Sequence, residues 1–267
     1  MKQLDLREIV TRLLIALVLL ASAFPVAAQA AQPPAAREVL YEVHPAPAAR
    51  TKTVGVLIFP GFEVLDAYGP MEMWGSLKHA PARFWGGEEK RVGVRVVTIA
   101  AKRGEISSNQ GPKTVADYGY DNAPPLDYLL VPGGVGVLPL LKDPATLNWL
   151  RGQAGRAEIV MSVCTGASLL AAAGILDGRP ATTNKMVFEQ AAEPGPKVKW
   201  VKKARWVDDG TVVTASGVSA GIDMSLAVIS RLYGKDMAAW LERVAEYDAH
   251  HDPSWDPFAV KAGLLEQ

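Results

Sequence analysis

The feature of this sequence that most constrains its fold is a series of short, almost continuous apolar runs. Five of them follow residue 53, at Val54–Phe59, Val92–Ile99, Tyr128–Val131, Ile159–Val163 and Val212–Ala215. A run that is apolar at nearly every position, and not only at alternate ones, is typical of a strand buried on both faces, as in a parallel sheet. We therefore expect these runs to form the centre of the fold.

Segments with helical periodicity separate the apolar runs, at Met71–Lys78, Pro139–Gln153, Gly166–Ala173, Ala220–Leu232 and Asp236–Asp248. Strands that alternate with helices over short connections predict an α/β fold, with an open, mostly parallel sheet and helices on both faces, as in flavodoxin-like proteins. Without an internal repeat or a second boundary, we predict one domain over residues 53–235. Residues 236–267 are expected to add a C-terminal helix and tail to that same domain.

The first 30 residues have the pattern of a secretory signal peptide. Three basic residues precede the apolar run Leu13–Phe24, and Ala28-Gln29-Ala30 has the small-x-small form of a cleavage site. Twelve apolar residues are fewer than the roughly 20 that span a bilayer, so we expect no stable membrane anchor. The sequence predicts export, to the periplasm, after cleavage near Ala30. Residues 31–52 contain four prolines and are interpreted as a Pro/Ala-rich leader that packs on a surface or stays mobile.

Composition and charge exclude several classes of partner. Lys plus Arg and Asp plus Glu number 28 each, so no net field attracts nucleic acid or an acidic membrane. Lys197–Trp206 mixes basic and aromatic residues, but its partial alternation favours a strand with solvated lysines over a nucleic-acid surface. His250 and His251 are adjacent and therefore make a poor chelate. The single cysteine excludes an intrachain disulfide and a thiolate-rich metal site, and we predict neither a metal nor a cofactor.

That cysteine, Cys164, follows the apolar run Ile159–Val163 and precedes the small-residue helix expected from Gly166. A strand that turns sharply into a helix at a nucleophile is typical of a nucleophile elbow. The N-terminus of the helix favours a thiolate, which is the reactive form of cysteine. The alternative is a buried, inert cysteine, which is common for this residue type. We favour the reactive interpretation.

Two other strand ends carry candidate site residues. Glu63 and Asp66 follow the first strand, just before a helix expected to begin near Pro70, and either carboxyl group has the chemistry to move a proton. Both acids would alternatively cap the helix or face water. After the third strand, Gly133 and Gly134 leave backbone N–H groups free to face a ligand. An oxyanion hole built from the N–H groups of Gly134 and Thr165 fits better than a nucleotide cradle, since the GxxxxGK(S/T) motif is absent and the dinucleotide-binding fingerprint is incomplete.

These three segments occur in order with Leu176–Thr183 and Thr214–Asp223, and together they resemble the PfpI/ThiJ superfamily, whose fold is class I glutamine amidotransferase-like. The resemblance covers about residues 53–234 and is strongest to the isonitrile hydratase branch. It implies that Cys164 is the nucleophile, that Asp66 rather than Glu63 is the acid of that branch, and that Thr165 is its functional threonine. It also implies a homodimer.

One position departs from the family pattern. The family usually has histidine after the threonine pair, where this chain has Asn184. Asparagine donates a hydrogen bond but cannot move a proton near neutral pH, so chemistry that needs a Cys–His pair is disfavoured. We therefore predict an exported, isonitrile hydratase-like enzyme that hydrates a small electrophilic molecule with Cys164 and Asp66. The alternatives are a non-catalytic ligand-binding or cysteine redox-sensing module, and a glyoxalase or protein-repair activity.

Overall fold

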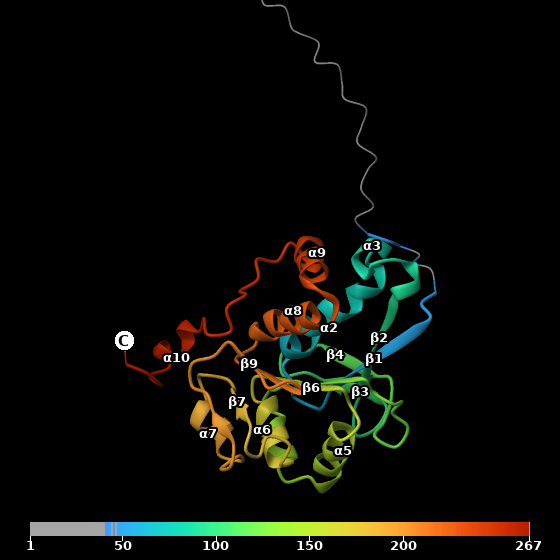
Figure 1. Ribbon diagram of the computed structural model, residues 1–267. Helices are drawn as coiled ribbons and strands as arrows, with labels where there is room; N and C mark the ends of the chain where they lie inside the picture. Colours follow the sequence, from blue (N-terminus) through green and yellow to red (C-terminus); the bar gives the residue numbers. More distant parts are fainter. Residues whose placement is uncertain (1–40, 44, 46, 267) are drawn as a thin grey trace, which may run out of the picture. The chain divides into compact units, whose positions relative to one another are not determined.

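The computed structural model describes residues 41–266 except 44 and 46, so the predicted signal peptide and most of the predicted leader lie outside the described residues. A six-stranded sheet runs through the centre of the structure (Figure 1). Its strand order is β2 (Val92–Ile99), β1 (Arg50–Leu57), β5 (Tyr128–Val131), β6 (Ile159–Val163), β10 (Val212–Ala215) and β9 (Trp206–Asp208). All neighbouring pairs are parallel except β10 with β9. The expected mostly parallel sheet is confirmed.

Helices cover both faces of this sheet (Figure 1). On one face lie α2 (Val64–Ser76), α3 (Ala82–Trp85), α8 (Ala220–Tyr233) and α9 (Lys235–Ala245). The other face is covered by α5 (Pro144–Ala154), α6 (Gly166–Ala172) and α7 (Phe188–Ala192), and α4 (Val137–Leu140) contacts α6. The central strands β5, β6 and β10 are buried at every position, as their continuous apolar sequence predicted.

The smaller elements lie around this framework. Strands β3 (Gly104–Ser107) and β4 (Lys113–Ala116) form an antiparallel hairpin, and β7 (Pro180–Ala181) pairs in parallel with β8 (Lys199–Trp200). Two single-turn 3-10 helices, η1 (Leu77–His79) and η2 (Glu88–Lys90), precede β2, and α10 (Pro257–Lys261) follows the long segment after α9. None of the helices in the described part of the chain is long and apolar enough to cross a membrane.

Two helices differ from the sequence-based expectation. The first begins at Val64 instead of near Pro70, and Pro70 lies inside it. A proline there removes one backbone hydrogen bond, but burial of Ala67, Met73 and Trp74 on the same helix outweighs that loss. The expected helix Pro139–Gln153 is divided into α4 and α5. Asp143 caps the second part by accepting a hydrogen bond from the Thr146 N–H, at 3.0 Å.

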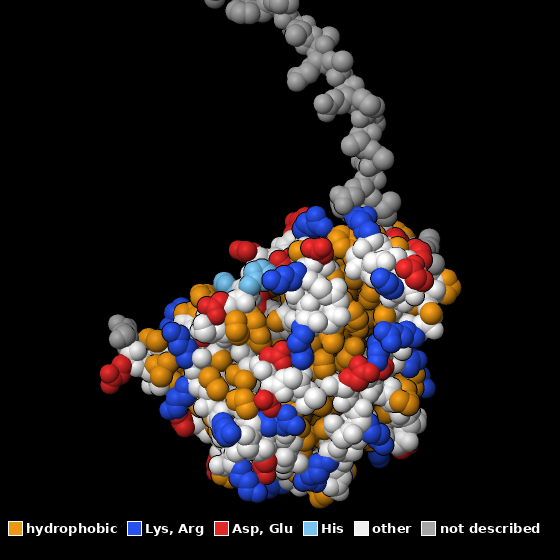
Figure 2. All heavy atoms as spheres, in the orientation of Figure 1, with side chains coloured by type: hydrophobic (Ala, Val, Ile, Leu, Met, Phe, Trp, Pro, Cys, Tyr) orange, Lys and Arg blue, Asp and Glu red, His pale blue; other side chains and the backbone are white. Residues whose placement is uncertain are grey.

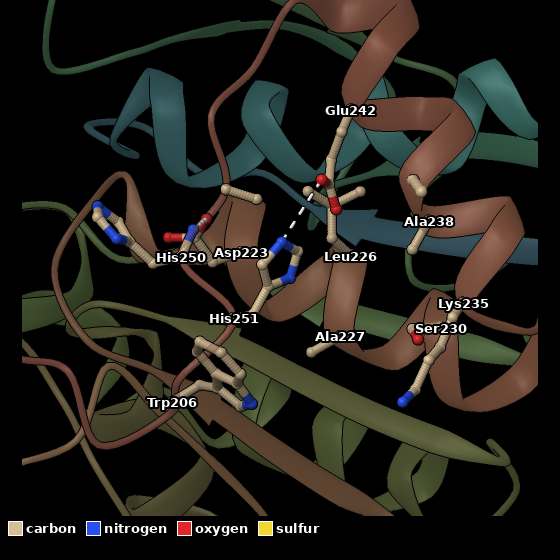
Figure 3. A pocket seen from close by; sticks show the side chains of 12 residues that line it. Trp206, Asp223, Leu226, Ala227, Ser230, Lys235, Ala238, Glu242, His250 and His251 are labelled. Carbon is tan, nitrogen blue, oxygen red and sulfur yellow. Dashed lines mark hydrogen bonds and ion pairs between the residues drawn. The ribbon is translucent and has the colours of Figure 1, made fainter.

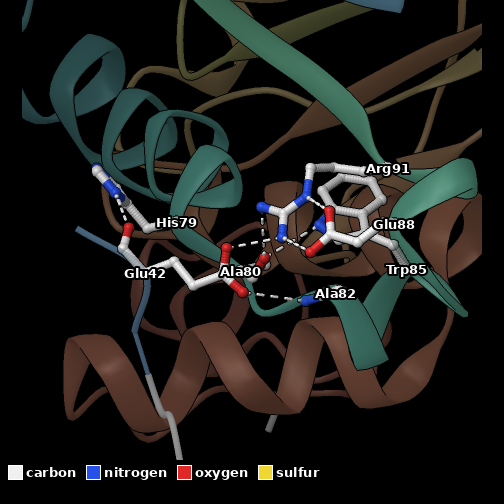
Figure 4. A network of polar contacts seen from close by, with 7 residues as sticks. All are labelled: Glu42, His79, Ala80, Ala82, Trp85, Glu88 and Arg91. Carbon is white, nitrogen blue, oxygen red and sulfur yellow. Dashed lines mark hydrogen bonds and ion pairs between the residues drawn. The ribbon is translucent and has the colours of Figure 1, made fainter. Parts of the chain in front are cut away.

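The described end of the predicted leader packs against the domain. The Tyr41 ring stacks on His79 with ring centroids 4.4 Å apart. The Glu42 carboxylate lies 2.7 Å from the guanidinium of Arg91, which is buried and also paired with Glu88 (Figure 4). Because a buried guanidinium needs compensating charge, this ion-pair network holds the segment before β1 against the start of β2.

Candidate active site

The carboxyl ends of four adjacent parallel strands, β1, β5, β6 and β10, meet at one edge of the sheet. The loop after β1 leads to Asp66, the loop after β5 contains Gly133, and β6 ends directly at Cys164. The loop after β10 contains Val218. In open α/β sheets this edge is where ligands bind, and here it brings together residues up to about 150 positions apart in the chain.

Cys164 has the backbone conformation of a nucleophile elbow. Its φ angle is +57°, in the left-handed region that residues other than glycine rarely adopt. The backbone is held there from both sides, because the Cys164 N–H donates to the Ser216 carbonyl at 2.7 Å and the Thr183 hydroxyl donates to the Cys164 carbonyl at 2.9 Å. The side chain is 6% exposed, so only a narrow opening reaches the sulfur. A strained, well-supported conformation of this kind is typical of functional positions.

Asn184, the residue after the threonine pair, contacts the sulfur directly. Its Nδ2 donates to Cys164 Sγ at 3.1 Å, and its Oδ1 accepts from the Met186 N–H at 2.9 Å. A backbone N–H is only a donor, so the amide oxygen must face Met186 and the NH₂ group must face the sulfur. Asn184 therefore stabilises negative charge on the sulfur but cannot remove the thiol proton.

Asp66 is fully buried in the first turn of α2. Its Oδ2 accepts a hydrogen bond from the Gly133 N–H at 2.8 Å, and Oδ1 has no hydrogen-bond partner among the described residues. Burial raises the pKa of Asp66 from its ordinary 3.8 to about 7, with a smaller contribution from Glu63 in the same direction. Cys164 is close enough to perturb this pKa. A carboxyl group with a pKa near neutrality both donates and accepts protons, as general acid–base catalysis needs.

The pKa of Cys164 differs from the expectation of a stabilised thiolate. Burial, followed by the charge of Asp66, raises it from 9.0 to about 12. Asn184 and the backbone N–H groups of Thr165 and Val218 oppose that rise. The expected effect of the helix N-terminus is thus present in the Thr165 N–H but is outweighed by desolvation. The resting form of the pair is a thiol beside a carboxyl group that titrates near pH 7.

Gly133 and Gly134 allow the loop after β5 to lie against the elbow. A Cβ atom on Gly133 would lie 2.6 Å from the Thr165 nitrogen and 3.0 Å from Asp66 Oδ2, so no larger residue fits. Gly134 has a φ of +121°, and its N–H donates to Thr165 Oγ1 at 3.0 Å. This N–H is therefore engaged within the protein, unlike the free oxyanion donor that the sequence suggested. The Thr165 hydroxyl accepts this bond and keeps its own proton for a ligand.

A cavity of about 430 Å³ opens at Cys164 and Thr165. Its walls are mostly apolar and come from the loop after β5, from α4 and from the start of α7; the apolar lining residues are Val135, Val137, Leu138, Leu141, Val187 and Ala191. Besides Thr165, the polar lining residues are Glu63, Asn109, Ser168 and Gln190. Leu138 is 70% exposed at the cavity mouth. The sequence reasoning missed Asn109, which the β3–β4 hairpin supplies, because a short polar hairpin carries no signal of its position relative to the sheet. This cavity suits a small molecule with an apolar substituent.

A second cavity, of about 490 Å³, lies between α8, α9 and the C-terminal segment (Figure 3). Cys164 does not line it. His251 Nε2 lies 3.5 Å from Glu242 Oε2 (Figure 3). His250 stacks instead on Trp255, with ring centroids 3.6 Å apart. Over the described residues, no three His, Cys, Asp or Glu side chains come together in an arrangement that holds a metal ion. The two histidines take part in separate contacts.

The basic and aromatic segment Lys197–Trp206 contains the short strand β8 and the start of β9. Trp206 is buried, and the Trp200 indole N–H donates to the Gly195 carbonyl at 3.0 Å. Lys197 and Lys202 are exposed and form surface ion pairs with acidic neighbours. Figure 2 shows basic and acidic side chains interspersed over the visible face. The aromatic rings thus pack inward and do not form a stacking surface for bases.

The fold and the elbow define a class of α/β proteins with a cysteine at the turn between a central strand and a helix. The DJ-1/PfpI family model matches residues 52–231, and the chain belongs to this family. The chain is 34% identical over 194 residues to an isonitrile hydratase of Pseudomonas putida, and the aligned region covers 73% of this chain and 78% of that protein.

The relatives are not all enzymes. The chain is 26% identical over 201 residues to the HTH-type transcriptional regulator GbdR of Pseudomonas aeruginosa, a match that covers 74% of this chain and 51% of the regulator. Among solved structures, a ThiJ/PfpI family protein from Pseudomonas syringae superposes with a TM-score of 0.66 at 27% identity, over 90% of this chain and 93% of that one. The family and the fold that the sequence motifs indicated are confirmed.

Proposed function

We propose that this protein is a cysteine-dependent hydratase that adds water to a small isonitrile with an apolar substituent. The observation that carries the proposal is the buried pair of Cys164 and Asp66, in which the pKa of the carboxyl group is raised to about 7 beside the thiol. The apolar cavity at the sulfur and the 34% identity to an isonitrile hydratase support the substrate class. Asn184 at the sulfur argues against reactions that need a histidine base.

In the first step, the Cys164 sulfur bonds to the terminal carbon of the isonitrile. Asp66, as a carboxylate, takes the thiol proton and delivers it to that same carbon, giving a thioimidate, R–N=CH–S–Cys. The thiol pKa of about 12 makes a free thiolate rare, so proton removal by Asp66 accompanies the attack. The hydrogen bond from Asn184 Nδ2 stabilises the sulfur while its charge develops.

In the second step, water adds to the thioimidate carbon. Asp66 accepts one proton of this water and passes it to the nitrogen, so that the tetrahedral intermediate R–NH–CH(OH)–S–Cys forms. The C–S bond then breaks as the hydroxyl group of the intermediate becomes a carbonyl, the hydroxyl proton returns to the sulfur, and an N-substituted formamide leaves. The hydroxyl of Thr165, which lines the cavity, is placed to donate to the oxygen or nitrogen of the intermediate. The sum of the steps is the addition of one water molecule to the isonitrile.

The test is hydration of a series of isonitriles with methyl, butyl and cyclic apolar substituents by purified protein, followed as formamide formation by NMR. We expect turnover that increases with apolar size until the cavity of about 430 Å³ is filled. Cys164→Ala and Asp66→Asn should each remove it, and the exposed Asp121→Asn should not. Turnover that persists in Cys164→Ala refutes the mechanism, and a series without turnover refutes the substrate class.

The structure gives less support to the redox-sensing alternative. A sensing cysteine needs thiolate character and access, whereas here burial raises the thiol pKa and leaves 6% of the residue exposed. Intact mass after mild peroxide tests this alternative, and rapid reversible oxidation of Cys164 would favour it. Loss of methylglyoxal tests the glyoxalase alternative, which the absence of histidine at position 184 disfavours.

Export and dimerisation remain part of the proposal. Export to the periplasm rests on the sequence of residues 1–30, and fractionation of cells with N-terminal sequencing of the mature protein would test it. A homodimer would cover the exposed apolar side chains near the cavity, such as Met186 at 83% exposure and Leu138 at 70%. Light scattering after size-exclusion chromatography would give the assembly state.

A further inference from the structure

A buried lysine stands next to the asparagine that contacts the sulfur. Lys185 is 3% exposed, and its Nζ donates to Thr182 Oγ1 at 2.5 Å and to the Thr183 carbonyl at 3.1 Å. Its charge partner is Asp256, whose Oδ2 lies 3.3 Å away and which is also 3% exposed. A buried ammonium group needs such a partner, since an isolated buried charge is strongly unfavourable. The mechanism above assigns no role to this pair.

The partner comes from the C-terminal segment, about 70 residues further along the chain. Asp256 caps α10, because its Oδ1 accepts from the Phe258 N–H at 3.1 Å. The same segment is attached to the sheet beside the site, where the Arg205 N–H donates to the Pro253 carbonyl at 2.7 Å. Phe258 lines a small cavity together with Asn184 and Val218. The C-terminal segment therefore lies against the loop that carries Asn184.

We propose that the buried Lys185–Asp256 ion pair is a positioning device, through which the C-terminal segment holds Asn184 Nδ2 against Cys164 Sγ. Lys185 follows Asn184 directly, so the position of its ammonium group restricts the backbone of the loop. The ring of Phe188 lies 5.5 Å from the same ammonium group and closes its other side. This inference rests on the proposed role of Cys164 as the reactive group.

We expect the Lys185–Asp256 pair to fix the position of the loop that carries Asn184, and to contribute little to the stability of the fold. A buried ion pair often contributes little net stability, because desolvation of both groups offsets their attraction. Removing one partner leaves the other uncompensated, and the lysine would then move toward solvent. Because Asn184 is adjacent, such a movement would withdraw its amide from the sulfur.

The test measures the rate at which iodoacetamide alkylates Cys164 in the full-length protein, which does not depend on the identity of the substrate. Asn184→Ala removes the hydrogen bond to the sulfur and should slow alkylation at pH 8 by about tenfold or more, as expected for a hydrogen bond to a charged group. Asp256→Asn should slow it by a similar factor. The double variant should be no slower than Asn184→Ala alone.

Asp177→Asn, which changes the exposed ion pair with Lys197, is the matched control and should alkylate at the wild-type rate. A faster or unchanged rate of alkylation in folded Asp256→Asn overturns the proposal. So does a double variant of Asn184→Ala and Asp256→Asn in which the two slowing factors multiply. If Asp256→Asn does not fold, Lys185→Met with Asp256→Leu replaces the pair by apolar groups and should show the same slowing. Failure of isonitrile turnover would leave these rates unaffected.

Discussion

The raised pKa of Asp66 predicts a distinctive dependence of protein stability on pH. The folded protein binds the Asp66 proton with a pKa of about 7, compared with 3.8 for the ordinary side chain. Below pH 4 the carboxyl group is protonated in both states. Between pH 4 and 7 the unfolded chain loses this proton first, so the folded state holds more protons and its stability falls as the pH rises. Above pH 7 the carboxyl group is ionised in both states, and the stability of the folded state no longer falls because of Asp66.

The size of the effect follows from the two pKa values. Each pKa unit corresponds to about 1.4 kcal/mol, so the Asp66 carboxyl group should destabilise the folded protein by about 4 kcal/mol at pH 8. Asn has the same shape, keeps an oxygen for the Gly133 N–H and has no charge to desolvate. Asp66→Asn should therefore gain about 4 kcal/mol of unfolding free energy relative to wild type between pH 4 and pH 8.

Urea unfolding at several pH values between 4 and 8.5 measures this difference. Contributions of other titrating groups are shared by the two proteins and cancel, and any fixed cost of the substitution does not change with pH. Asp121→Asn changes an exposed carboxyl group and is the control. The difference between its unfolding free energy and that of wild type should hardly change with pH. A difference between Asp66→Asn and wild type that is flat or that falls with rising pH would refute the argument that burial raises this pKa.

Three further predictions concern the neighbours of the pair. Asn184→His places an imidazole beside the sulfur and should accelerate alkylation of Cys164 near pH 7; an unchanged rate would contradict the contact of 3.1 Å. Gly133→Ala should lower the free energy of unfolding, measured by chemical denaturation, by more than about 2 kcal/mol, because its Cβ would lie 2.6 Å from a backbone nitrogen. The control Gly152→Ala, in α5, should be neutral or stabilising. Leu138→Glu puts a charge at the mouth of the apolar cavity and should raise KM for isonitriles with apolar substituents more than it lowers kcat.

Much of the sheet was predictable because its strands are encoded locally. Four of the five apolar runs, from Val92 to Ala215, coincide with strands β2, β5, β6 and β10, and the remaining run overlaps β1. The elbow at Cys164 was also visible, since a buried strand meets a small-residue helix at one residue. Helix ends were less predictable. Pro70 was expected to begin a helix and instead lies within one, because the packing of the helix face outweighs the local cost of proline.

The sequence by itself determined the order of strands and helices, the family, and the identity of the residues at the strand ends. Only the tertiary structure decided how those residues act on one another. Burial raises the pKa values of Asp66 and Cys164. The Met186 N–H orients the Asn184 amide so that its NH₂ group faces the sulfur. The Gly134 N–H donates a hydrogen bond to the Thr165 hydroxyl. The physical reason is that apolar periodicity is a local property of the chain. Desolvation and hydrogen bonding in the site depend on segments that come together only when the sheet is assembled.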